Sequence, residues 1–295
     1  MNIDAPIVVA YGGGLNSTAM LVGMAKKEIK PDLILMADTG GEKPETKRFV
    51  SHMAAWVRRT WDMDIIVVTK TGIDATLEDE CERKSMLPSL AYGFKSCSLK
   101  WKVAPQDKYV NNWKPAKDAW AAGDRVTKVI GYDADEDRRA KIHTDNKYDY
   151  WYPLIEWQWG RDECAQAVVD AGLPTPPKSS CFFCPAMKPK EILALRDSHP
   201  DLFARAIAME SNANLTTVKG LGRRFSWASV ASADEDQMRL FADSFADEEP
   251  CGCYDGDHDG IHKTVVELTT SAGCNNKKRF TDDSKTQPPA KEGQE

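Results

Sequence analysis

Residues 7–17 of this chain read IVVAYGGGLNS. The apolar start is typical of a buried strand, and an amphipathic stretch begins at Thr18, so the segment predicts a strand, a glycine turn and the start of a helix. Three successive glycines remove every β-carbon from the turn. Backbone N–H groups can therefore surround a phosphate, and the helix N-terminus adds partial positive charge. The turn is a candidate anion-binding loop.

This loop differs from the Walker type, because it contains no lysine and no Gly-Lys-Ser/Thr sequence. It resembles instead the Ser-Gly-Gly-x-Asp-Ser signature of the PP-loop ATP pyrophosphatases, particularly the branch with the phosphoadenylyl-sulfate (PAPS) reductases. Gly12 replaces the first serine, and Asn16 replaces the aspartate. The resemblance implies a nucleotide-binding set of Gly12, Gly13, Gly14, Asn16 and Ser17, with Asn16 and Ser17 also catalytic. For this loop by itself, a packing role is the alternative.

A second matching segment, DTGGEKPET at residues 38–46, follows the apolar run 33–37. Ligands of open parallel sheets bind at the carboxyl ends of strands, so Asp38 and Thr39 are candidate nucleotide contacts. PAPS reductase-like proteins have a similar Asp-Thr-Gly sequence followed by Pro-Glu-Thr. A helix cap would explain Asp38 alone but not the whole run.

A third segment, GYDADEDRRA at residues 131–140, follows the predicted strand segment VTKVI at residues 126–130. The resemblance implies that Gly131 lets the chain approach the nucleotide and that Glu136 and Arg138, or Arg139 in its place, line the site as catalytic residues. Arginine suits phosphate or sulfate oxygens, because its planar group donates two parallel hydrogen bonds. A solvated cluster of mixed charge is the alternative.

Eight cysteines bear on the chemistry. No N-terminal signal sequence is visible, and no segment approaches the roughly 18 apolar residues of a membrane helix. We therefore expect a cytoplasmic protein, where stable disulfides are uncommon and paired cysteines more often bind metal or carry out redox chemistry.

Cys181 and Cys184 form a CFFCP motif, in which two thiolates can hold one metal from the same side. Cys97 begins the segment CSLKWKVAP. Sulfonucleotide reductases with a [4Fe–4S] cluster, and the related DNA phosphorothioation proteins, are similar in having a cysteine before a Lys-x-x-Pro segment and then a CxxC pair. The resemblance implies that Cys97, Cys181, Cys184 and Cys253 are ligands, with Cys251 as the alternative fourth. Structural zinc and an unligated thiol pair stay open.

The predicted fold is α/β. Strands near 6–10, 32–37, 64–69 and 126–131 alternate with helices near 17–29, 43–60 and 98–113, which indicates a parallel sheet flanked by helices, as in the adenine nucleotide alpha hydrolases. The predicted domains are a nucleotide-binding PP-loop domain at 1–175, a helical, cysteine-bearing metal-binding region at 176–274 and a disordered tail at 275–295.

The net charge of −6 gives no overall attraction to a polyanion. Local basic patches occur around Cys97, with Lys95, Lys100 and Lys102, and at residues 219–224, KGLGRR. Such patches can hold a sulfonucleotide, a tRNA or a DNA end, although solvated surface is their default role. A tRNA or DNA substrate is thus conceivable but has no direct support.

By resemblance, we expect an enzyme that binds ATP with Mg²⁺ and cleaves it to AMP and pyrophosphate, leaving an adenylate that a sulfur or nitrogen nucleophile displaces. A sulfur donor protein would be a further partner. The alternative enzyme is a PAPS or APS reductase, but that chemistry depends on a C-terminal Glu-Cys-Gly-Leu-His motif, and Cys274 lacks those neighbours. A non-catalytic regulator that binds nucleotide and metal is the third possibility.

Overall fold

Five short strands form one parallel sheet in the computed structural model, which describes residues 5–140 and 145–233. The strands are β1 (Ile7–Ala10), β2 (Leu33–Asp38), β3 (Ile65–Thr69), β4 (Val126–Ile130) and β5 (Tyr148–Trp151). Their order is β3-β2-β1-β4-β5, and each neighbouring pair is parallel. The predicted α/β class with a parallel sheet is confirmed. All described residues belong to one compact unit of the chain, residues 1–256.

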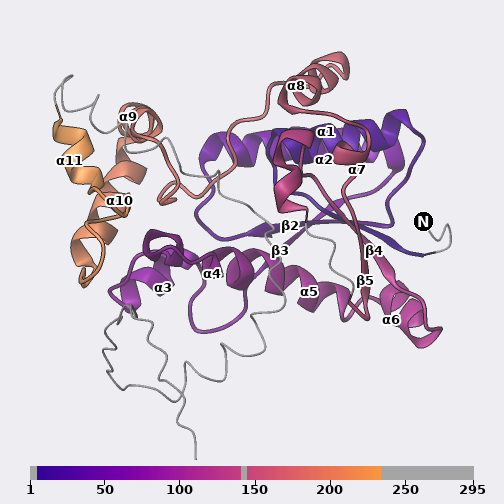
Figure 1. Ribbon diagram of the computed structural model, residues 1–295, viewed down its shortest axis with the longest axis horizontal. Coiled ribbons are helices and arrows are strands. Elements are labelled where there is room, and N and C mark those ends of the chain that lie inside the picture. The colour runs from indigo at the N-terminus through magenta and orange to yellow at the C-terminus, as the bar shows by residue number, and fades with distance from the viewer. Residues whose placement is uncertain (1–4, 141–144, 234–295) are drawn as a thin grey trace, which may run out of the picture. The chain divides into compact units, whose positions relative to one another are not determined.

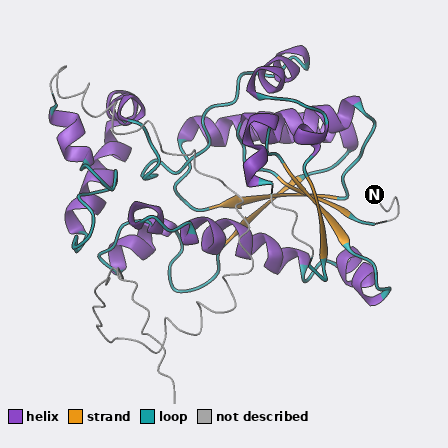
Figure 2. Cartoon of the chain, viewed as in Figure 1, coloured by secondary structure: helices purple, strands orange, loops and turns teal. Residues whose placement is uncertain are grey.

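Helices cover both faces of this sheet (Figures 1 and 2). One face carries α1 (Leu15–Lys26), α2 (Pro44–Trp61), α7 (Pro153–Glu156) and α8 (Arg161–Asp170). Their apolar side chains pack in one core with Val9, Ile34 and Val129. The opposite face carries α5 (Ala104–Val110) and α6 (Lys114–Ala121), which pack on Val8 and Leu35. Alternate residues of one strand therefore enter different cores, as the strand period requires.

A third core lies outside the sheet. It joins α3 (Leu77–Arg83) and the short turns η1 (Ser89–Tyr92) and α4 (Ser96–Ser98) to the helices α9 (Pro189–Ser198), α10 (Pro200–Asn212) and α11 (Trp227–Ser232). Its largest fully buried members are Trp101, Phe182, Phe183 and Trp227. The predicted C-terminal helical region is present in α9–α11, and it packs against residues that precede the predicted boundary at 175, which stays a prediction.

The helix predicted near 98–113 is interrupted. A π-helical turn, η2 (Leu99–Val103), precedes α5, and α5 ends at Val110. Pro105 has no N–H to donate to the carbonyl of residue 101, so the regular hydrogen-bond ladder cannot run through this point. Pro115 in the first turn of α6 begins a separate helix in the same way.

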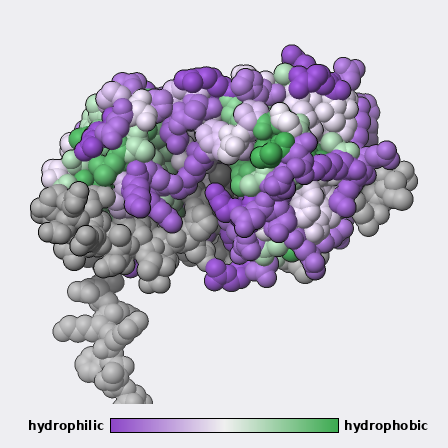
Figure 3. Space-filling view, turned by 90° about the horizontal axis from the view of Figure 1, so that it is seen from above, coloured by the Kyte–Doolittle hydropathy of each residue, from purple (hydrophilic) through white to green (hydrophobic). Residues whose placement is uncertain are grey.

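The face seen in Figure 3 is mostly hydrophilic, with smaller apolar areas between the charged ones. Helix α1 contributes little to such surfaces, because α7 and α8 pack against it and residues 17–24 are all buried. Among the helices of residues 5–140 and 145–233, none is long and apolar enough to cross a membrane.

Candidate functional site

The glycine loop lies at the switch point of the sheet. Strand β1 is central, with β2 on one side and β4 on the other, so the connections after β1 and after β4 leave the sheet next to each other. Open parallel sheets bind their ligands in the crevice at such a point, beyond the carboxyl ends of the strands. The loops at 11–17 and 131–136 occupy this position.

A pocket of about 670 Å³ lies between these two loops. Six of the residues predicted for nucleotide binding or catalysis line it: Gly12, Gly14, Asn16, Ser17, Gly131 and Glu136. Gly13 is not in the lining, because it faces Val50 and Met36 behind the loop. Asp38 and Arg138 are also outside the lining, and Asp38 Oδ1 accepts a hydrogen bond from the Gly40 N–H at 2.8 Å.

Gly131 permits the close approach of the two loops. A β-carbon at this position would lie 3.1 Å from Ser17 Cα and 3.2 Å from Ser17 N. Both are backbone atoms in the first turn of α1, so a side chain would push the glycine loop away from β4. The sequence resemblance named this glycine for approach to the nucleotide, and the structure shows a close approach to the loop itself.

Asn16 faces two carboxylates. Its amide Nδ2 donates to Asp133 Oδ2 at 2.8 Å and to Glu136 Oε2 at 3.3 Å. Asp133 is buried, and Glu136 also pairs with Arg139. An aspartate at position 16 would remove the donor and add a third carboxylate. The departure from the PP-loop signature at this position therefore has a local physical reason.

We expect Asn16→Asp to lower the free energy of unfolding in the presence of a chelator by about 1–3 kcal/mol, the usual cost of leaving buried polar groups unsatisfied. Mg²⁺ should restore part of the loss, because it neutralises clustered carboxylates. Thermal unfolding with EDTA and with Mg²⁺ measures both effects. Asn16→Ala is the control, since it removes the donor without adding charge. Equal stability of Asn16→Asp and the unaltered protein in EDTA would contradict the expectation.

The charge of the pocket suits a polyphosphate. Five basic and two acidic side chains line it: Lys102, Arg139, Arg161, Lys178 and Lys188, against Glu136 and Glu191. Two basic residues are in ion pairs, Arg139 with Glu136 and Lys178 with Glu191. Arg139 lines the pocket, whereas Arg138 is exposed outside it, so the geometry favours the second arginine of the predicted pair.

Cys97, Cys181 and Cys184 line one small pocket of about 30 Å³. Thr39 also lines it, and Thr39 Oγ1 lies 3.1 Å from Cys181 Sγ. The structure therefore places Thr39 at the cysteines, although the sequence suggested a nucleotide contact. Four residues line both this pocket and the larger one: Lys102, Ser179, Ser180 and Cys184. The two pockets are thus adjacent parts of one site.

The turn after β2 holds the CxxC motif in place. Glu42 forms an isolated antiparallel bridge with Cys181, and the Phe182 N–H donates to the Gly41 carbonyl at 2.8 Å. A β-carbon on Gly41 would lie 2.9 Å from the Phe183 ring and 3.0 Å from Cys181 Cβ. Gly41 therefore permits the approach of the cysteine motif, whereas Gly40 lies against Thr76.

Cys97 is held by a second network. Its N–H donates to Ser89 Oγ at 2.7 Å. Three residues further, Lys100 pairs with the buried carboxylate of Glu80, and Trp101 Nε1 donates to Glu80 Oε2 at 2.8 Å. Glu80 on α3 therefore fixes the helical segment that begins with Cys97.

Glu80 makes the stability of this segment dependent on pH. Burial alone raises the pKa of Glu80, but hydrogen bonds from Lys100, Lys84 and Trp101 outweigh burial and bring the pKa to about 2. An unfolded glutamate titrates near pH 4.3, so the stabilisation is present above about that pH and is lost as the pH falls toward 2.

We expect Glu80→Gln to unfold at lower urea concentration at pH 7, with the difference from the unaltered protein shrinking between about pH 4.5 and pH 2. Urea unfolding at a series of pH values measures this. A difference that stays constant across the series would show that the charge of Glu80 does not stabilise the fold.

The donor set of the small pocket fits a thiolate-bound metal, since three thiols meet there and none of the five cysteines in the described ranges is in a disulfide. No group of three His, Cys, Asp or Glu residues in that part of the chain is already arranged as a metal site. The predicted fourth ligand, Cys253 or Cys251, and Cys274 lie outside the described residues. Metal ligation by these cysteines stays a proposal.

Cys81 and Cys164 line neither pocket. Burial raises the pKa of each thiol to about 12, with smaller contributions from neighbouring charges. Both stay protonated at neutral pH, whereas a metal ligand or nucleophile must be a thiolate. Substitutions of Cys81 and Cys164 are therefore suitable controls for substitutions of the three pocket cysteines.

Several residues of the site were not predicted. Lys102, which the sequence named only as part of a local basic patch, reaches both pockets from the π-helical turn, and Gln106, which it did not name, reaches the larger one from α5. Gln106 Oε1 and Ser180 Oγ are buried and have no hydrogen-bond partner in the described structure. Such atoms normally require a partner, so a polar ligand in the pocket would satisfy them. The Ser-Ser pair before the CxxC motif is the one sequence signal that could have indicated this.

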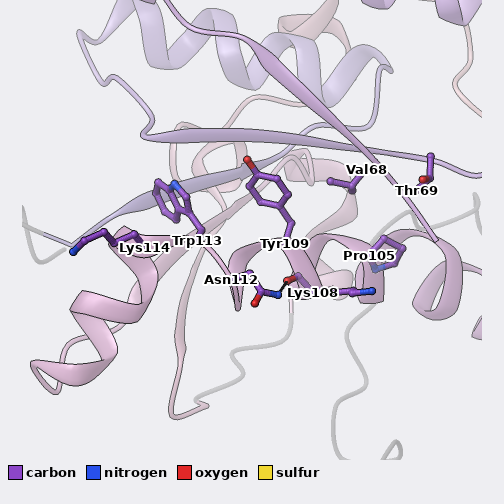
Figure 4. A pocket seen from close by; sticks show the side chains of 8 residues that line it. All are labelled: Val68, Thr69, Pro105, Lys108, Tyr109, Asn112, Trp113 and Lys114. Carbon is purple, nitrogen blue, oxygen red and sulfur yellow. Dashed lines mark hydrogen bonds between the residues drawn. The ribbon is translucent and has the colours of Figure 1, made fainter. Parts of the chain in front are cut away.

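A separate pocket of about 500 Å³ lies at the edge of the sheet, where β3 ends (Figure 4). Tyr109, Asn112 and Trp113 line it from the end of α5 and the turn before α6. It contains neither the glycine loop nor a cysteine, so it is not part of the candidate site.

Comparison with protein families agrees with this geometry. The model of the phosphoadenosine phosphosulfate reductase domain matches residues 6–162, which is more than half of the chain and includes both loops of the larger pocket and Cys97. The chain therefore belongs to the phosphoadenosine phosphosulfate reductase domain family, as the motifs predicted.

A curated relative is the Uncharacterized protein MJ0973 of Methanocaldococcus jannaschii, 23% identical over 222 residues. The match covers 68% of this chain and 47% of the relative, so the chain spans about half the length of that protein. A similar solved structure is the U34-tRNA thiolase NcsA from Methanococcus maripaludis with its [4Fe-4S] cluster, at a TM-score of 0.41 and 14% identity, covering 78% of this chain and 81% of that one. At this TM-score the similarity carries no functional argument.

Proposed function

We propose that this protein is an ATP pyrophosphatase that activates an acceptor as its adenylate, for displacement by a sulfur or nitrogen nucleophile. The observation that carries the proposal is the adjacency of the two pockets: the glycine-loop pocket and the three-cysteine pocket share Lys102, Ser179, Ser180 and Cys184. A nucleotide on the loop would therefore present its reacting end toward the cysteines.

In this proposal the backbone N–H groups of residues 12–17 bind the phosphates, and Arg139 and Lys102 stabilise negative charge. An acceptor oxygen attacks the α-phosphorus, the bond to the β-phosphate oxygen breaks, and pyrophosphate leaves. The nucleophile then displaces AMP from the adenylate. Asp133 and Glu136, beside Asn16, would hold Mg²⁺, which neutralises charge on the leaving phosphates when bound.

Cys97, Cys181 and Cys184 would hold a [4Fe–4S] cluster, which supplies a redox-active or sulfur-binding iron centre when present. Zinc is the alternative occupant, because the same thiols suit it. Ser180 and Gln106 lie where they can donate to or accept from the acceptor or the transferred group.

The test is the product of ATP cleavage. Protein purified without oxygen is incubated with Mg²⁺, ATP labelled at the α-phosphate, and small thiols, tRNA or DNA as acceptors. We expect AMP and pyrophosphate in equal amounts, lost in Gly12→Ala and retained in Cys164→Ala. ADP and phosphate as products would contradict the proposal.

A PAPS or APS reductase is the second candidate, because the matching family model is that of PAPS reductases. In that reaction a cysteine thiolate attacks the sulfate sulfur, the bond from sulfur to the phosphate oxygen breaks, and the nucleotide leaves as adenosine bisphosphate from PAPS or as AMP from APS. A thiol of thioredoxin then attacks the cysteine sulfur of the thiosulfonate, which releases sulfite and forms a disulfide. Sulfite release from PAPS with thioredoxin, compared before and after truncation at Gly273, tests it. Sulfite that depends on Cys274 would replace adenylation as the proposed activity.

A further inference from the structure

Two basic segments without acidic residues meet beside the cysteine pocket. Residues 84–106 contain four lysines and no Asp or Glu, and residues 211–233 contain three basic residues and no Asp or Glu. The whole chain has 45 acidic residues among 295, so such stretches are a marked local departure. The net charge of −6 for the whole chain therefore gives no indication of this locally basic surface.

The two segments are in direct contact. The Asn214 N–H donates to the Ser85 carbonyl at 2.8 Å. The Arg223 guanidinium lies against Gly93, since a β-carbon on that glycine would be 2.9 Å from Arg223 Nη2. Four basic side chains are exposed on this surface: Lys95, Lys219, Arg223 and Arg224. We call this set, with Phe94, the Phe94 surface.

Phe94 lies between Lys95 and Gly93, the glycine against which Arg223 lies, and Phe94 is 67% exposed. An exposed aromatic ring among arginines and lysines is the combination that binds single-stranded nucleic acid, because bases stack on the ring while the cations bind phosphates. A protein partner with an apolar pocket would not require the cluster of cations.

The surface is rigidly presented. The buried carboxylate of Glu210 accepts hydrogen bonds from the N–H groups of Leu221 at 2.7 Å and Trp227 at 2.9 Å, on either side of the two arginines. Arg223 itself has a left-handed backbone, with φ of 60°, which is unfavourable for a non-glycine residue. Backbone strain of this kind persists only where the surroundings fix it, and it clusters at functional sites.

The surface is also close to the cysteines. Phe94 precedes Cys97 by three residues, a span of at most about 11 Å of extended chain. Pro88, in the same basic segment, lines the cysteine pocket together with Cys97. If one nucleotide stacks on Phe94, the nucleotides next to it in the strand can therefore reach the cysteine pocket.

We propose that the Phe94 surface binds an unpaired segment of RNA, with one base stacked on Phe94 and phosphates on Arg223, Arg224 and Lys219. This inference rests on the proposed function and names the class of its acceptor. The small patch, with one ring and four cations, suits a splayed-out nucleotide rather than a duplex groove, and loops of folded RNA present such nucleotides.

The test is fluorescence anisotropy of a labelled RNA hairpin with a single-stranded loop, measured without ATP. We expect Phe94→Ala to raise the Kd by about fivefold or more, the usual loss of one stacked base. The double variant Arg223→Gly with Arg224→Ser should reduce the slope of log Kd against log salt by about 1.4, since each phosphate contact on a single strand contributes about 0.7. Glycine at 223 suits the left-handed backbone, so folding is preserved.

Tyr109→Ala with Lys114→Ser is the matched control, because it removes a half-exposed aromatic residue and an exposed cation from the separate pocket of Figure 4. It should leave the Kd unchanged. Unchanged affinity in the Phe94 and arginine variants, or equal binding of an RNA duplex or of a DNA hairpin of the same sequence, would overturn the inference. RNA binding without AMP formation would instead contradict the proposed ATP cleavage and still support RNA binding by the Phe94 surface.

Discussion

Gly12→Ala should raise the Kd for ATP at least about tenfold, equivalent to 1.4 kcal/mol, while leaving the unfolding temperature unchanged. Gly12 lines the larger pocket, and the nearest atom to a β-carbon there is Ser17 Oγ at 3.7 Å, an ordinary contact. The added methyl group therefore fits the empty protein, and it competes only with the phosphates. Isothermal titration with ATP and thermal unfolding measure the two quantities.

Gly123→Ala is the control with the opposite pattern. Gly123 has φ of 85° and no atom within 4 Å of a β-carbon, so alanine there strains the backbone without touching the pocket. It should lower the unfolding temperature and leave the ATP affinity unchanged. Undiminished ATP affinity in a folded Gly12→Ala protein would remove the phosphate-binding role of the loop.

Alanine at Cys97, Cys181 or Cys184 should each lower the iron bound after anaerobic purification by at least about tenfold and abolish the brown colour. Loss of a residue that only orients a ligand already costs about 10- to 100-fold in metal affinity, and loss of a ligand should cost no less. Iron and sulfide analysis, with visible absorption, measures the effect.

Cys81→Ala and Cys164→Ala are the matched controls, because both thiols are buried and line neither pocket. They should retain the iron. A colourless protein with about one zinc per chain, lost in the three pocket variants, would favour a structural zinc site over the cluster. Iron that survives in all three pocket variants would place the metal elsewhere in the chain.

The sequence could predict the sheet where strands are mostly apolar. Strands β1 to β4 lie close to the expected ranges, because β1 to β3 are largely apolar runs and β4, VTKVI, keeps three apolar residues around Thr127 and Lys128. Strand β5, YDYW, is at the sheet edge with an exposed aspartate, so it lacks that signal. Helix α3 was also missed, because its seven residues include four acidic ones and its stability comes from the network around Glu80.

The candidate site divides in a similar way. Backbone positions were predictable, since glycines at strand ends mark the loops, and six predicted residues line the larger pocket. Side-chain directions were not. In the short 3₁₀ turn η3 (Ala134–Arg139), neighbouring arginines point differently, so only the fold distinguishes Arg139 from Arg138. Thr39 likewise faces the cysteines because the turn after it pairs with the CxxC motif.

The adjacency of the two pockets has a further consequence for the π-helical turn. Lys102 lies in this turn and lines both pockets, and Gln106 lies in the first turn of α5, directly after Pro105. Restoring a regular helix would shift the side chains on either side of the junction. This irregular segment, between Cys97 and Gln106, therefore sets the alignment of the cysteine pocket with the larger pocket.

The most direct test of that joint site is a crystal structure of the anaerobically purified protein with a non-hydrolysable α,β-methylene analogue of ATP, with anomalous data collected at the iron edge. We expect iron at Cys97, Cys181 and Cys184 and the triphosphate on residues 12–17, with Lys102 between them. No anomalous signal at the three cysteines, a signal at the zinc edge alone, or a nucleotide bound away from the glycine loop would contradict the proposed site.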